Sequence, residues 1–118
     1  MKITKTMKLV STMLLLFAAV ALAQPAHASA RTDAVLAGST DAYTSVFQGG
    51  APAIVRVSGD GDTVLVLSVY DQNGHLIGRD TCRYNDCVVS WRPIWTGPFA
   101  IRISNLGSVY NNYTIVTI

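Results

Sequence analysis

The fold is decided by TVLVLSVYDQNGHLIGRD, residues 63–80. Thr63–Tyr70 is nearly continuous in apolar residues, which is typical of a strand buried on both faces, and its β-branched content argues against a helix. The next four residues, Asp71–Gly74, contain the pair Asn-Gly, which tolerates the left-handed backbone of a tight turn. His75–Asp80 then has the composition of a return strand. The segment therefore predicts an antiparallel β-hairpin.

The chain on either side of this hairpin continues the same pattern, with short β-branched and aromatic runs between Gly, Asn, Asp and Pro. Alternation is clearest over FAIRIS, where Phe99, Ile101 and Ile103 are expected to face inward. Further strands are predicted over Ala42–Gln48, Ala53–Ser58, Val88–Trp91 and Tyr110–Ile118. About seven or eight short strands without a helix predict an all-β fold, an antiparallel β-sandwich or jelly roll.

The first thirty residues have the three parts of a secretory signal peptide. Met1–Lys8 contains all three lysines, Leu9–Ala23 is an uncharged, mostly apolar run, and two overlapping A-x-A patterns place cleavage after Ala28 or Ala30. The apolar run is shorter than the roughly 20 residues that span a bilayer, so no membrane span is expected after cleavage. The short basic region and the A-x-A site are typical of bacteria, which predicts a periplasmic or secreted protein.

The charges that remain after this leader are nearly balanced. From Arg31 onward there are six arginines and seven aspartates, with no Lys and no Glu. Binding to nucleic acid or to an anionic membrane requires a basic patch, and these arginines are scattered along the sequence. We therefore expect neither partner. Residues 31–41 are small and polar, so we predict a flexible N-terminal segment ahead of a folded domain over residues 42–118.

Two cysteines, Cys82 and Cys87, lie close together in CRYNDC. In an oxidising compartment such a pair favours a disulfide, and two thiolates alone are a poor set for zinc, which takes four ligands. The closed loop is short, so the chain-entropy model gives a stabilisation of about 2 kcal/mol. The alternative is two free thiols in a hairpin. We predict a local disulfide that stabilises a small core.

Three segments together resemble a known family: DTVLVLSVYDQNGHLIGRD (62–80), PIWTGPFAIRISNLG (93–107) and the terminal YNNYTIVTI. Their order and spacing resemble bacterial pre-peptidase C-terminal (PPC) domains, which commonly carry a hydrophobic strand, a D-x-N-G type turn, a second strand and a later P-x-x-T/A-G-x-Y/F-x-I-R-V segment. The resemblance covers roughly residues 43–118. It implies a β-sandwich of jelly-roll type and a non-catalytic accessory role, and some relatives bind collagen or calcium.

Calcium is the cofactor to consider for this chain. Asp60 and Asp62 in the turn GDGD, together with Asp71 if it lies nearby, offer oxygen ligands to Ca²⁺, which takes six to eight. Asp and Gly are also the ordinary residues of turns, and Val64 stands where the D-x-D-L motif of the family has its second aspartate. We therefore expect no cofactor, with calcium as the alternative.

Catalysis would depend on His75, the one histidine after residue 30. A Ser–His–Asp triad holds its histidine between an acid and a nucleophile. His75 follows a hairpin glycine, where an exposed polar residue is expected, and no G-x-S-x-G elbow is present. We therefore predict that the protein is not an enzyme, and a small hydrolase is the less favoured hypothesis.

A recognition surface built from aromatic residues is the remaining hypothesis. Trp95 lies in a proline-bounded loop and is the candidate ligand-binding residue, whereas Trp91 is expected in the core. Tyr84, Tyr110 and Tyr113 could join the two tryptophans in one platform. The sequence thus predicts a non-catalytic exported β-sandwich module that binds or stabilises a protein or glycan partner at the cell envelope or outside it. A carbohydrate- or calcium-binding module is the alternative.

Overall fold

A computed structural model describes residues 4–5 and 28–118 of the chain. These residues form strands and turns, and the strands are β1 Thr4–Lys5, β2 Ser29–Val35, β3 Thr40–Phe47, β4 Ala53–Ser58, β5 Leu65–Tyr70, β6 Leu76–Thr81, β7 Asp86–Trp91, β8 Gly97–Asn105 and β9 Asn111–Thr117. The apolar run of the predicted signal peptide, residues 9–23, lies outside the described residues. Within the described part of the chain, no helix is long and apolar enough to cross a membrane.

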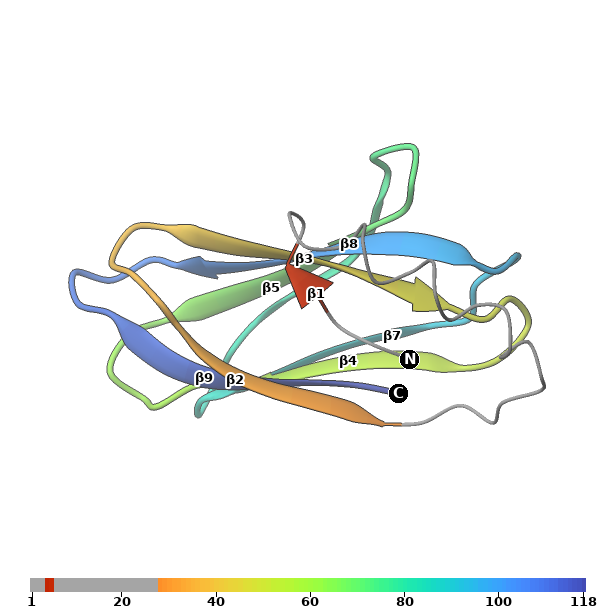
Figure 1. Cartoon of the computed structure of the whole chain (residues 1–118). Helices are drawn as coiled ribbons and strands as arrows, with labels where there is room; N and C mark the ends of the chain where they lie inside the picture. The colour runs from red at the N-terminus through yellow and green to blue at the C-terminus, as the bar shows by residue number, and fades with distance from the viewer. Residues whose placement is uncertain (1–3, 6–27) are drawn as a thin grey trace.

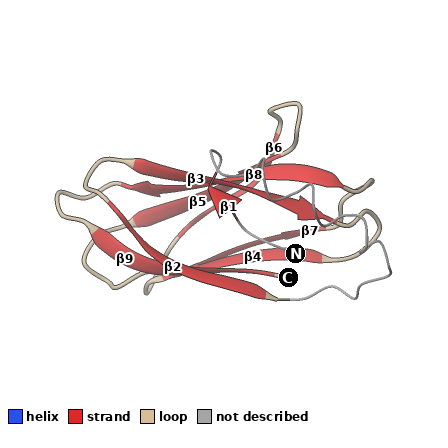
Figure 2. Cartoon of the chain, viewed as in Figure 1, coloured by secondary structure: helices blue, strands red, loops and turns tan. Residues whose placement is uncertain are grey.

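Strands β2–β9 make two antiparallel sheets that pack face to face (Figures 1 and 2). One sheet has the order β3-β8-β5-β6, with the two-residue β1 beside β3, and the other has the order β2-β9-β4-β7. The first of the eight long strands therefore pairs with the last, and the second pairs with the seventh. This nesting is the strand order of a jelly roll, which confirms the predicted fold class.

The core lies between the two sheets, because alternate residues of most strands point inward. Phe99, Ile101 and Ile103 are buried on β8, as the alternation predicted. On β5, Leu65, Leu67 and Val69 are buried, but Val66 and Tyr70 on the opposite face are only half-buried. The prediction that this strand is buried on both faces is therefore wrong for Val66 and Tyr70, although Ser68 between them is buried. No further layer of the described chain covers the outer face of this sheet.

The predicted tight turn between β5 and β6 is confirmed. Gly74 has a left-handed backbone with φ of 83°, and its amide donates to the carbonyl of Asp71 over 3.0 Å. Gly74 suits this geometry because it has no Cβ to clash in the left-handed region, whereas Asn73 does not adopt a left-handed backbone here.

The segment predicted to be flexible, residues 31–41, is instead ordered structure. β2 runs antiparallel to β9 over its whole length, and β3 begins at Thr40. Sequence pattern missed β2 because its side chains are mostly small or polar, and its pairing comes from backbone hydrogen bonds to the last strand of the chain. The sandwich therefore begins at Ser29. Cleavage after Ala28 leaves β2 whole, whereas cleavage after Ala30 removes its first two residues.

Two buried tyrosines join the sheets through their hydroxyl groups. Tyr43 on β3 and Tyr113 on β9 are each 1% exposed, and their hydroxyl oxygens lie 2.5 Å apart. The Tyr113 hydroxyl donates to the carboxylate of Asp41 over 2.6 Å, and the carboxylate of Asp33 lies 3.4 Å from the Tyr43 hydroxyl. The polar end of each ring is thereby hydrogen-bonded, which lets both rings fill the core.

The predicted disulfide is present, and Cys82–Cys87 closes the β6–β7 hairpin. Tyr84 and Asn85 at its tip both have left-handed backbones, with φ of 50° and 76°, and the Asp86 amide donates to the Arg83 carbonyl. Two consecutive left-handed residues define a type I′ turn, which matches the twist of the flanking strands.

The loops collect at the two ends of the sandwich because successive strands run in opposite directions (Figure 1). We call one the disulfide end, with the loops over residues 36–39, 59–64, 82–85 and 106–110. The other is the Trp95 end, with the loops over residues 48–52, 71–75 and 92–96.

Candidate functional site

The three candidate calcium ligands do not meet. Asp60 and Asp62 lie at the disulfide end, whereas Asp71 follows β5 at the Trp95 end. The Asp60 carboxylate accepts hydrogen bonds from the amides of Asn112 and Asp62, which hold its pKa below the usual range. Among the described residues, no group of three His, Cys, Asp or Glu side chains could hold a metal. Asp60 thus organises a loop, and calcium binding stays the alternative to the expected absence of a cofactor.

Asp71 has a similar structural role in the β5–β6 turn. Its carboxylate accepts hydrogen bonds from the amides of His75 and Asn73, each over 2.9 Å. The His75 bond has the larger effect in lowering the pKa of Asp71. The His75 ring lies 3.4 Å from the same carboxylate, and its side chain is 77% exposed. His75 is therefore exposed in the turn, as the sequence predicted.

The five aromatic residues proposed as one platform are dispersed. Tyr113 is buried in the core, and Trp91 packs edge-on against Phe47, with ring centroids 4.9 Å apart. Tyr84 and Tyr110 are exposed at the disulfide end, and Trp95 is exposed at the opposite end. The prediction of a single platform is therefore wrong, because the direction of each strand decides at which end of the sandwich its flanking residues lie. Trp91 lies against the core, as predicted.

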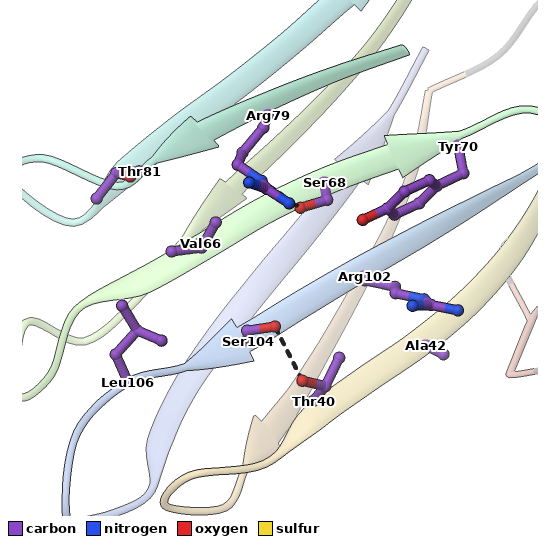
Figure 3. A pocket seen from close by; sticks show the side chains of 10 residues that line it. All are labelled: Thr40, Ala42, Val66, Ser68, Tyr70, Arg79, Thr81, Arg102, Ser104 and Leu106. Atoms are coloured by element: carbon purple, nitrogen blue, oxygen red, sulfur yellow. Dashed lines mark hydrogen bonds between the residues drawn. The ribbon is translucent and has the colours of Figure 1, made fainter. Parts of the chain in front are cut away.

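A broad open hollow of about 680 Å³ lies on the outer face of the β3-β8-β5-β6 sheet (Figure 3). We call this surface the arginine face. It is lined by Thr40, Ala42, Val66, Ser68, Tyr70, Arg79, Thr81, Arg102, Ser104 and Leu106. Most of these side chains are small or of medium size, and the long ones are Tyr70, Arg79 and Arg102.

Register brings the two arginines of this face together. Ser68 on β5 pairs with Arg79 on β6 and with Arg102 on β8. Adjacent strands lie about 4.8 Å apart, so the two arginine Cα atoms are separated by about 10 Å. Figure 3 shows Arg79 turned toward Ser68 and Arg102 beside Tyr70.

Both arginine side chains are held in place by neutral neighbours. The Arg79 Nε donates to the Ser68 hydroxyl over 3.3 Å, and the Arg102 guanidinium lies 5.1 Å from the centre of the Tyr70 ring. In the described part of the chain, neither guanidinium has an ion-pair partner, and no acidic residue lines the hollow. The arginine face therefore carries two uncompensated positive charges in a domain whose formal charge is slightly negative.

A smaller groove of about 280 Å³ opens at the Trp95 end, between the β5–β6 turn and the 92–96 loop. Trp95 is 57% exposed and lines it, as does the adjacent Ile94, which is 84% exposed. The structure therefore places the sequence candidate Trp95 in a concave site. The arginine face was missed, although strand alternation already placed Arg102 on an outward face.

The fold and its two surfaces define an all-β jelly-roll sandwich with one cationic sheet face and one aromatic groove. No protein-family model matches the chain, and no curated protein matches it. A solved structure of similar fold is that of Aeromonas hydrophila PliG, described as a periplasmic lysozyme inhibitor of g-type lysozyme. The two are 15% identical, with a TM-score of 0.60 over 80% of this chain and 90% of that chain. At this identity the likeness shows the fold. The PPC resemblance stays a prediction from the residues.

Proposed function

We propose that this chain is an exported, non-catalytic binding protein whose arginine face docks on an acidic surface of another protein. The observation that carries the proposal is the pair of uncompensated guanidinium groups, Arg79 and Arg102, on an open sheet face. Arginine forms paired hydrogen bonds with carboxylates and is enriched at protein interfaces. An anionic partner would therefore be attracted to this surface.

Shape and comparison both support a protein as the partner. The arginine face is wide and open, whereas sites for small molecules enclose most of the ligand surface. A fold similar to that of PliG, a lysozyme inhibitor, fits a module that acts by contact rather than by catalysis. The predicted signal peptide and the disulfide fit export to the periplasm or beyond.

The test reverses the two charges. In a column experiment with envelope extract, the immobilised wild-type chain is expected to retain a defined set of proteins. The double variant Arg79→Glu/Arg102→Glu is expected to retain about tenfold less of that set, and added salt is expected to weaken retention by the wild type. Arg56→Glu is the matched control, because Arg56 is exposed on β4 of the other sheet. Equal retention by the double variant and this control would show that the arginine face does not bind the retained proteins.

A narrower function, inhibition of a lysozyme, is favoured by the likeness to PliG. The measurement is the rate at which a g-type lysozyme clears a cell-wall suspension, with and without the chain. Inhibition that is weakened by Arg79→Glu/Arg102→Glu is the expected result. An unchanged clearing rate at every concentration of the chain would contradict inhibition of that enzyme.

A further inference from the structure

The loop that carries Trp95 is exposed but firmly held. The Gly49 amide donates to the Thr96 hydroxyl over 2.9 Å, and the Gly50 amide donates to the Pro93 carbonyl over 2.7 Å. A Cβ at Gly49 would lie 2.5 Å from the Trp95 Cα, so the β3–β4 turn packs directly against the backbone of the loop. The backbone that carries the exposed indole is thus held in place, which lowers the entropic cost of ordering the loop on binding.

The groove beside Trp95 has an apolar floor. Trp91, Phe99, Pro98 and Ile77 line it, and Trp91 and Phe99 are fixed by ring contacts, with their centroids 5.2 Å apart. A groove of this size, about 280 Å³, is at the small end of ligand sites in proteins. It suits one or two rings of a ligand better than a folded protein surface.

The polar rim of the groove carries no net charge. Arg92 donates to the Gly50 carbonyl, and the Asp71 carboxylate is occupied by its own turn, so the two opposite charges are both engaged. Gln72 and Asn73 also line the groove, and the described residues offer neither side-chain amide a hydrogen-bond partner. The rim therefore offers neutral donors and acceptors above an apolar floor.

We infer that the Trp95 groove binds a neutral glycan. The apolar C–H face of a pyranose ring would stack on the indole of Trp95, which is large, flat and half exposed. The ring hydroxyls would exchange hydrogen bonds with the free amides of Gln72 and Asn73, which can each both donate and accept. The inference is independent of the proposed protein-binding function, because the groove and the arginine face share no lining residue.

The experiment is a titration of the full domain with chitotetraose, cellotetraose or maltotetraose. Binding is measured by calorimetry and by tryptophan fluorescence. At least one of these neutral oligosaccharides is expected to bind. Trp95→Ala is expected to weaken that binding by at least about tenfold, and Gln72→Ala/Asn73→Ala by a smaller factor. Tyr84→Ala is the matched control, because it removes an exposed aromatic ring at the opposite end of the sandwich and is expected to leave binding unchanged.

Two outcomes would overturn the inference. One is the absence of binding to all three oligosaccharides; if Trp95→Ala then also loses the retained protein set, the groove is part of a protein interface. The other is equal binding by Trp95→Ala and Tyr84→Ala. Loss of retention by Arg79→Glu/Arg102→Glu with intact glycan binding would separate the two sites.

Discussion

Replacing Asn105 with alanine is expected to lower the free energy of unfolding by about 3 kcal/mol. Asn105 is 1% exposed at the end of β8. Its Nδ2 donates to the carbonyls of Val35 and Val109, over 3.1 and 2.8 Å, and its Oδ1 accepts from the Gly107 amide over 2.9 Å. One side chain thus satisfies three backbone groups in two segments, the end of β2 and the 106–110 loop. Alanine would leave the buried Val35 carbonyl without this donor and open a small cavity.

Urea unfolding followed by tryptophan fluorescence measures this loss. Asn112→Ala is the matched control, because Asn112 is exposed on β9 and its side chain has no hydrogen-bond partner among the described residues. The control is expected to stay within about 0.5 kcal/mol of the wild type. Equal stability of the two variants would mean that water replaces Asn105 at no cost, and that the disulfide end does not depend on it.

The strands that could be predicted are those whose own side chains alternate or cluster. Ala53–Ser58 was predicted at the bounds that β4 has, and Phe99–Ser104 lies within β8. Both depend on local hydrophobic pattern, which burial against the opposite sheet enforces. The turn after β5 was equally local, because it is formed within Asp71–Gly74, where the Asp71 carboxylate accepts from the Asn73 amide and Gly74 takes the left-handed backbone.

The features that could not be predicted depend on partners far away in the sequence. β2 is stabilised by pairing with β9, at the other end of the chain, and its own residues carry no strand pattern. Asp33 and Asp41 looked like part of a flexible segment, yet both carboxylates lie by the hydroxyls of core tyrosines. Such long-range hydrogen bonds leave no periodic signal.

The candidate functional residues also divide into those with a local sequence signal and those without one. Trp95 could be predicted because it is a large aromatic residue in a proline-bounded loop, whereas core residues are expected on strands. The arginine face was missed because Arg79 and Arg102 are neighbours only through the register of β5 with both β6 and β8. Scattered charges in a sequence therefore do not exclude a charged patch in a sheet protein. They exclude a patch formed by consecutive residues, which is a narrower statement.

The hydroxyl of Tyr113 is the second feature with a large expected effect. Tyr113→Phe is expected to lower the free energy of unfolding at pH 7 by about 2 kcal/mol, because hydrogen bonds to charged groups contribute more than neutral ones. The lost bonds are those to the Asp41 carboxylate and to the Tyr43 hydroxyl, which link the two sheets. Tyr110→Phe is the matched control, because it removes an exposed hydroxyl directly before β9, the strand that carries Tyr113. This control is expected to change the free energy of unfolding by less than about 0.5 kcal/mol.

The pH dependence tests the burial of this phenol separately from the loss of its hydrogen bonds. Burial, followed by the Asp41 hydrogen bond, raises the pKa of Tyr113 far above its usual range. In the unfolded chain a tyrosine ionises near pH 10, so above that pH the unfolded state binds fewer protons than the folded state. The contribution of Tyr113 is therefore fully present below about pH 10 and is lost as the pH rises further, by up to about 1.4 kcal/mol per pH unit. Denaturant unfolding is measured between pH 8 and pH 11.5, which extends about 1.5 units above that ionisation. The wild type is expected to lose stability more steeply than Tyr113→Phe over this range. The stabilities of the two proteins should converge at alkaline pH, and parallel curves would show that the phenol ionises within the folded sandwich.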